Sequence, residues 1–94
     1  MLEIIHENDN LIKLSGRWDA AQADRAKAEF DKLNSTSTID FQKLDYISSS
    51  GIGVLVTTLK RLDSQGHKLI LTNLNQYVRN VLHLTGLESF FEIR

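Results

Sequence analysis

The 94-residue sequence contains neither cysteine nor proline. Without cysteine the chain has no disulfide framework and no thiolate metal site, which excludes the disulfide-stabilised class of small secreted domains. Because proline is absent nothing marks a rigid linker, and no segment is repetitive or of low complexity. We therefore expect residues 1–94 to form one domain, which is also what this length allows.

An excess of either charge is lacking too: eleven basic and twelve acidic residues leave a formal net charge of -1. Nucleic-acid binding usually shows as a basic excess, so nucleic acid is not expected as the main partner. The acidic N-terminal segment does not resemble a signal peptide, and no apolar run approaches the roughly 20 residues of a membrane helix. The sequence therefore predicts a cytoplasmic protein without membrane insertion.

The hydrophobic residues, 41% of the chain, alternate between strand and helix periodicities. The pattern predicts an N-terminal hairpin, then a parallel βαβ unit, and then a final helix and a short strand. The expected strands are 2–6, 11–16, 38–41, 68–72 and 90–93, and the expected helices are 19–33, 51–65 and 75–86. This order indicates the α/β class, with a mixed sheet and helices mainly on one face.

Side chains at the expected helix starts have the chemistry of caps. Asp19 precedes Gln22 at the spacing of a capping box, and Asn75 is a suitable cap for the last helix. Trp18 stands just before the first of these helices. It has two readings: a hydrophobic staple against Ala23, or a contact for a partner protein.

The turn Ser48-Ser49-Ser50-Gly51-Ile52-Gly53 is the most informative segment. One serine suffices as a helix cap, and we expect Ser49 to be that cap with Ser50 at the first helical position. Each glycine in a first turn costs roughly 1 kcal/mol of helix propensity, which favours a small-residue tip that a protein or a kinase approaches. A phosphate on this tip would add about -1.5 to -2 charges, which the helix N-terminus tolerates and a docked partner does not.

Other chemistries have weaker support in the sequence. The glycines match neither a dinucleotide fingerprint nor a phosphate loop, and the serines are not in a Gly-x-Ser-x-Gly elbow. His6, His67 and His83 are scattered without ligand spacing, so no metal site is expected. Asp40 is not accompanied by the acidic pair of a receiver domain, and we expect it at a strand end, bonded to nearby backbone donors.

Three segments together resemble the STAS domain, and more narrowly the bacterial anti-sigma factor antagonists. They are Gly16-Arg17-Trp18-Asp19 before an alanine-rich helix, residues 39–55 with the serine turn, and Val81-Leu82-His83-Leu84-Thr85-Gly86-Leu87 with Phe90. The three occur in the family's order and span nearly the whole chain.

The resemblance implies a STAS-like single domain with four or five strands, and a protein that is not an enzyme and needs no cofactor or metal. Such antagonists bind a serine kinase that is also an anti-sigma factor or switch protein. The kinase phosphorylates the serine before the signature glycine, here Ser50 with Ser49 as second choice; the phosphorylated form is released, and a serine phosphatase resets it. The expected partner-binding residues are Trp18, Asp19, Ile47, Ser48, Ser49, Ser50, Gly51, Ile52 and Gly53.

One residue departs from the family pattern, and a second function is compatible with the resemblance. The family usually has an aspartate where this chain has Ser48, which bears on the identity of the partner. STAS-like chains of this size also serve as constitutive structural subunits of bacterial lipid-transport ABC complexes. The retained Ser49-Ser50-Gly51 favours the phosphorylation switch, and the neighbouring genes would distinguish the two.

Overall fold

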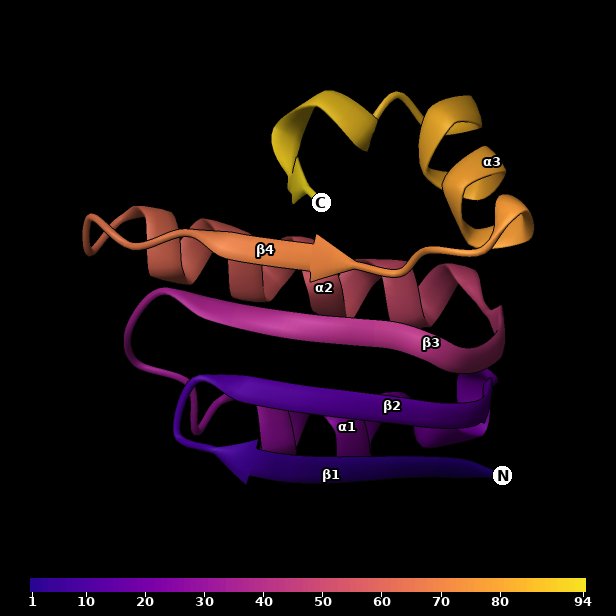
Figure 1. Ribbon diagram of the computed structural model, residues 1–94, viewed down its shortest axis with the longest axis horizontal. Coiled ribbons are helices and arrows are strands. Elements are labelled where there is room, and N and C mark those ends of the chain that lie inside the picture. The colour runs from indigo at the N-terminus through magenta and orange to yellow at the C-terminus, as the bar shows by residue number, and fades with distance from the viewer.

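A five-stranded mixed sheet organises residues 1–94, all of which the computed structural model describes (Figure 1). The strands are β1 Leu2–Asn8, β2 Leu11–Trp18, β3 Ser37–Ile47, β4 Leu69–Thr72 and β5 Glu92–Ile93. The helices are α1 Ala23–Phe30, α2 Ser49–Asp63 and α3 Gln76–Leu84, with short 3-10 turns η1 Ala20–Gln22 and η2 Glu88–Phe90. The predicted α/β class is confirmed.

The strands lie in the sheet in chain order, β1-β2-β3-β4-β5. β1 pairs antiparallel with β2, as the predicted hairpin requires, and every other neighbouring pair is parallel. Two consecutive βαβ units follow from this order, β2-α1-β3 and β3-α2-β4, of which the sequence indicated only the second. Helices α1 and α2 lie together behind the sheet, and α3 lies beside the end of β4 (Figure 1).

β3 is longer than the segment 38–41 that its apolar pattern predicted. Its pairing with β2 shifts register twice, between Lys13 and Ser15 and again between Gly16 and Arg17. Each shift adds a residue to β3, as a β-bulge does, and bends the strand. The strand therefore continues to Ile47, which is buried one residue before Ser48 and the start of α2.

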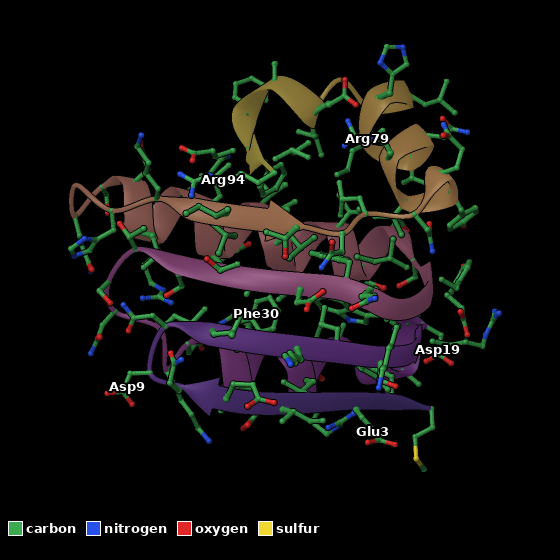
Figure 2. All side chains as sticks on the ribbon, viewed as in Figure 1. Glu3, Asp9, Asp19, Phe30, Arg79 and Arg94 are labelled. Carbon is green, nitrogen blue, oxygen red and sulfur yellow. The ribbon has the colours of Figure 1, made fainter.

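The hydrophobic core lies between the sheet and the helices, and Trp18 and Phe30 are among its largest side chains. Their rings meet edge to face, with centroids 5.4 Å apart. Figure 2 shows Phe30 among the side chains behind the strands, and Asp19 at the end of the sheet where β2 leads into η1. Trp18 is thus a core residue that fixes α1 against the end of β2.

The start and end of the first helix differ from the prediction. Asp19 makes no capping hydrogen bond, and the chain turns through η1 before α1 begins at Ala23. The Gln22 side chain accepts from Arg25 at 3.1 Å and forms no capping box. At the other end α1 stops at Phe30. The Arg61 guanidinium of α2 donates to the carbonyls of Phe30, the last residue of α1, and of Leu33, which ties the end of α1 to α2.

The predicted cap of the last helix is confirmed. The Asn75 side chain accepts from the Val78 N–H at 2.8 Å and donates to the Leu44 carbonyl at 2.8 Å. The bond to Leu44 joins the start of α3 to β3, which is the neighbour of β4 in the sheet. Asp40, by contrast, lies inside β3 and not at its end, where it accepts from the Gln42 N–H and the Asn73 amide.

Candidate functional site

The capping residue of α2 is Ser48, not Ser49 as the sequence suggested. Ser48 has extended backbone angles, and its Oγ accepts from the Gly51 N–H at 3.2 Å. Ser49 and Ser50 are the first two helical residues. Ser48 is the position where the family pattern has aspartate, and aspartate and serine are both preferred caps. The departure from the pattern therefore keeps the cap and removes its negative charge.

The end of β2 holds this helix start in place. The Ser48 N–H donates to the Trp18 carbonyl at 2.8 Å. Only Ser48 separates β3 from α2, so the helix direction is set directly by the bulged strand. The serine turn is thus presented by a rigid junction between two parallel strands and a helix.

Gly51 is a packing glycine. A Cβ on it would lie 2.7 Å from Cγ1 of Ile47 and 3.1 Å from the ring of Trp18, closer than side-chain atoms normally approach. The sequence predicts that the glycines of the serine turn leave room for a partner. For Gly51 the space is filled by the protein's own core.

Gly53 has the opposite surroundings. It is exposed, and a Cβ on it would meet no atom within 4 Å. Nothing within the domain requires glycine here, although glycine weakens the first turns of a helix. Gly53 is therefore not a packing glycine, and the space where a side chain would lie is open.

The three serines differ in exposure and bonding. Ser48 is buried, Ser49 is exposed, and Ser50 is half-buried. The Ser50 Oγ lies 3.2 Å from the Ser48 Oγ, within hydrogen-bond distance. The first turn of α2 contains no acidic residue, so the positive end of the helix dipole is not compensated by a side chain of that turn.

Part of the predicted partner-binding set belongs to the core. Trp18 and Ile47 are 0% and 2% exposed, so the structure places both side chains in the hydrophobic core. Gly51 and Ile52 are largely buried as well. The accessible members of the set are Asp19, Ser49, Ser50 and Gly53. The Asp19 Oδ1 and the Trp18 Nε1 have no hydrogen-bond partner in the domain.

A groove that the sequence did not predict lies between α2 and α3 and begins at the serine turn. Its volume is about 670 Å³, and most of its lining side chains are hydrophobic. Ile52 and Val56 line it from α2, and Val81 lines it from α3. These residues repeat at helical spacing beside the core face of each helix. That signal was present in the sequence, but it could not show that the two stripes face one gap.

Aromatic contacts close the end of this groove near the strands. The rings of Tyr46 from β3 and Tyr77 from α3 stack with centroids 5.6 Å apart. The Arg17 guanidinium lies 4.3 Å from the centroid of the Tyr46 ring. The stacked tyrosines therefore line the groove together with Ser48 and Ser49.

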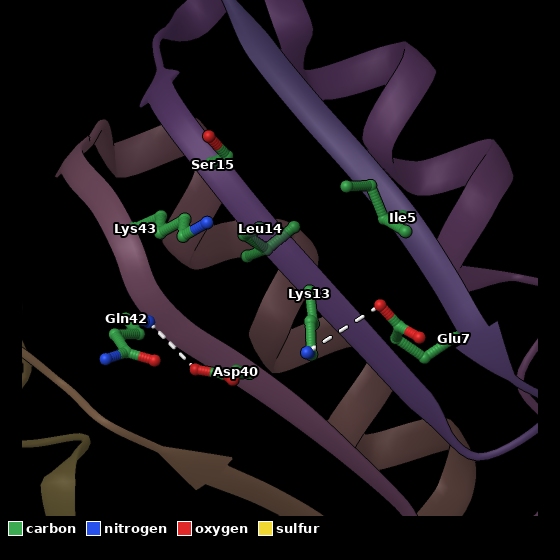
Figure 3. Close-up of a pocket in the computed structure, with 8 residues that line it drawn as sticks. All are labelled: Ile5, Glu7, Lys13, Leu14, Ser15, Asp40, Gln42 and Lys43. Atoms are coloured by element: carbon green, nitrogen blue, oxygen red, sulfur yellow. Dashed lines mark hydrogen bonds and ion pairs between the residues drawn. The ribbon is translucent and has the colours of Figure 1, made fainter.

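A second hollow, on the face of the sheet that α1 and α2 leave uncovered, is small and polar. It has a volume of about 170 Å³ (Figure 3). Lys13 pairs with Glu7 across it at 3.7 Å, and Asp40 accepts from the Gln42 backbone. Paired charges on an open surface are typical of a solvated face, so we do not assign a site to it.

Charged clusters away from the serine turn are surface pairs. The hydrogen bond from Lys32 is the main reason that the pKa of Glu29 lies below its usual value; partial desolvation opposes this effect, and His6 adds to it. Arg94, and then Lys68, lower the pKa of Glu92 in the same way. No group of three or more His, Asp or Glu side chains is placed to hold a metal ion. None of the helices has the length and apolar character needed to cross a membrane.

Residues 3–94 match the STAS domain family. The chain therefore belongs to the STAS domain family. Within it, the similarity is to proteins named as anti-sigma factor antagonists. BtrV of Bordetella bronchiseptica, which carries that name, is 33% identical over 85% of this chain and 72% of its own length. The anti-sigma-B factor antagonist of Bacillus subtilis is 29% identical over 94% of this chain and 84% of its own length.

Solved structures share the fold. The anti-sigma factor antagonist SpoIIAA in its unphosphorylated form superposes with a TM-score of 0.80 and 19% identity, over 100% of this chain and 88% of that one. The phosphorylated form of the Bacillus cell fate determinant SpoIIAA gives a TM-score of 0.73 and 18% identity, over 100% and 91%. At these identities the likeness concerns the fold.

Proposed function

We propose that this chain is a phosphorylation-controlled anti-sigma factor antagonist that acts by partner switching. Relatives with the name of antagonist support this proposal, as does the existence of SpoIIAA structures in both phosphorylation states. The observation that carries it is the division of roles among the serines. Ser48 makes the cap, so the half-buried Ser50 hydroxyl is available for modification without loss of the helix start.

In the proposed reaction a serine kinase transfers the γ-phosphoryl group of ATP to Ser50. The Ser50 Oγ gives its proton to a base of the kinase and forms a bond to the γ-phosphorus, while the bond to the β,γ-bridging oxygen breaks and ADP leaves. The kinase supplies the nucleotide and its magnesium, so the antagonist contributes the acceptor and no catalytic group. Ser49 is the second candidate acceptor. It is the more exposed serine, but it precedes Ser50 and not the packing glycine Gly51.

The unphosphorylated domain would dock through the exposed part of the turn and the groove beside it. Ser49, Ser50 and Gly53 form its polar tip, and the apolar groove between α2 and α3 adjoins the tip at Ser49. A phosphate at this tip adds about -1.5 to -2 charges that a partner must desolvate on docking. The domain itself keeps its fold, because negative charge is favourable at a helix N-terminus.

The proposed partners are a kinase that is also an anti-sigma factor and a serine phosphatase that removes the phosphate. A cytoplasmic location, and a single functional unit over residues 1–94, belong to the same proposal. The alternative role, a constitutive subunit of a lipid-transport complex, would use the groove and leave the serines unmodified.

The acceptor is tested by incubating the chain with its cognate kinase and ATP and locating the phosphate by mass spectrometry. We expect one phosphate on Ser50, and no incorporation in the Ser50→Ala variant, while Ser49→Ala is still phosphorylated. Phosphate only on a distant residue such as Thr57 would refute the assignment. A pull-down that yields a permease or its ATPase, with the serines unmodified, would favour the transport role.

A further inference from the structure

Ser48 is placed to do more than cap α2. Its Oγ accepts the Gly51 N–H at 3.2 Å and lies 3.2 Å from the Ser50 Oγ. A serine hydroxyl has one proton to donate and two lone pairs to accept with. Ser48 is therefore able to accept from Gly51 and donate to a group on Ser50 at the same time. An aspartate in the same position would also cap, but it has no proton to donate when ionised.

Resting on the proposed function, we infer that Ser48 is a positioning residue that holds the phosphoryl group of phosphorylated Ser50 against the start of α2. The Ser48 hydroxyl donates to a phosphate oxygen and keeps accepting from the Gly51 N–H. The N-terminal end of α2 favours the negative charge of the phosphate, because a helix start has unsatisfied N–H groups and the positive end of the dipole. The phosphate is then an ordered part of the turn and not a mobile charge in solvent.

Two features of the surroundings favour this arrangement. Ser48 is only 9% exposed, so the direction of its side chain is fixed by its neighbours. The first turn of α2 has no acidic residue to compete for the donors. The charged residues at the neighbouring strand ends are Arg17, Asp19 and Asp45, and all three can be left unchanged in every test variant.

Phosphoserine placed genetically at position 50 allows a test that needs no kinase. The matched pair Ser48→Asn and Ser48→Asp differs in one group, because both side chains cap a helix about equally well but only asparagine is neutral and able to donate. The readout is the apparent pKa of the phosphate, followed by ³¹P NMR as the pH is varied. Because a carboxylate raises this pKa by its charge alone, the comparison of the unaltered chain with the neutral Ser48→Ala variant isolates the contribution of the donor.

We expect the phosphate pKa to be lowest with Ser48 and Ser48→Asn and highest with Ser48→Asp. The difference within the pair should be about half a unit or more, because a carboxylate would lie near the dianion. Ser48→Ala, which is smaller and therefore fits the buried position, should lie above the unaltered chain because it removes a donor. Equal values for Ser48→Asn and Ser48→Asp, or for Ser48→Ala and the unaltered chain, would overturn the inference.

The pKa measurements on the Ser48 variants and the kinase assay for the proposed function test different claims. If no kinase modifies Ser50 but the order of pKa values holds, the contact between Ser48 and the phosphate stands and the switch does not. If Ser50 is the kinase's acceptor but the order fails, the switch stands and the positioning role of Ser48 does not.

Discussion

At the scale of single residues, the two glycines of the serine turn have opposite reasons to be glycine. Gly51 is pressed against Ile47 and the Trp18 ring, whereas Gly53 faces open space. From the sequence both read as small residues that leave room for a partner. Only the packing of α2 on the end of β2 separates a residue that serves the fold from one that is free to serve binding.

Alanine at each glycine in turn should therefore give opposite effects on stability. Gly51→Ala should lower the free energy of unfolding by about 1–3 kcal/mol, because the core must shift to admit the methyl group. Gly53→Ala should leave stability unchanged or raise it by up to about 1 kcal/mol through helix propensity. Chemical denaturation measures both values.

The affinity for a partner is the second property in which the alanine variants of Gly51 and Gly53 can be compared. If a partner covers Gly53, its alanine variant should bind more weakly than the unaltered domain in calorimetry while unfolding at the same or a higher denaturant concentration. Unchanged binding by Gly53→Ala would place the interface elsewhere. A Gly51→Ala variant as stable as the unaltered domain would contradict the packing that we describe.

At the scale of elements, side chains from one helix or loop complete the ends of another. Arg61 of α2 bonds the carbonyls at the end of α1, and Asn75 joins the start of α3 to β3. The bond from Asn75 to β3 fixes the start of α3, and the groove lies between α3 and α2.

Asn75 has two functions that one substitution can separate. Asn75→Ala should destabilise the domain by about 1–2 kcal/mol, since it removes both the cap and the bond to Leu44. Asn75→Asp keeps the capping oxygen and loses the donor, so it should cost less. Thermal unfolding of the two variants checks this order; a variant Asn75→Asp that is as unstable as Asn75→Ala would show that the link to Leu44 dominates.

Some features of the helices and strands could be predicted from the sequence, and others could not. Hydrophobic periodicity predicted the hairpin, the βαβ unit over β3, α2 and β4, and the cap of α3, because each depends on residues close together in the chain. It did not predict the length of β3, because bulges arise from pairing with β2. It assigned the cap of α2 to Ser49, since three consecutive serines are equivalent until the backbone angles are known.

At the scale of the whole molecule, only part of the predicted partner-binding motif is exposed. The motif contains both exposed and buried residues, and the buried ones, such as Trp18 and Ile47, determine where the exposed ones lie. The family resemblance was carried by this whole motif, which combines residues that build the fold with residues that are exposed. The groove beside the turn was missed because its walls come from two helices far apart in sequence.

We propose that phosphate on Ser50 switches binding and leaves the fold unchanged. The measurement is the affinity of the domain with serine or with phosphoserine at position 50 for its cognate anti-sigma factor, by calorimetry, with thermal unfolding of both forms. We predict at least about 100-fold weaker binding by the phosphorylated form, close to 2.7 kcal/mol, and a melting temperature equal to or above that of the unmodified form. Equal affinities, or a phosphorylated domain that has lost its cooperative unfolding, would contradict the account.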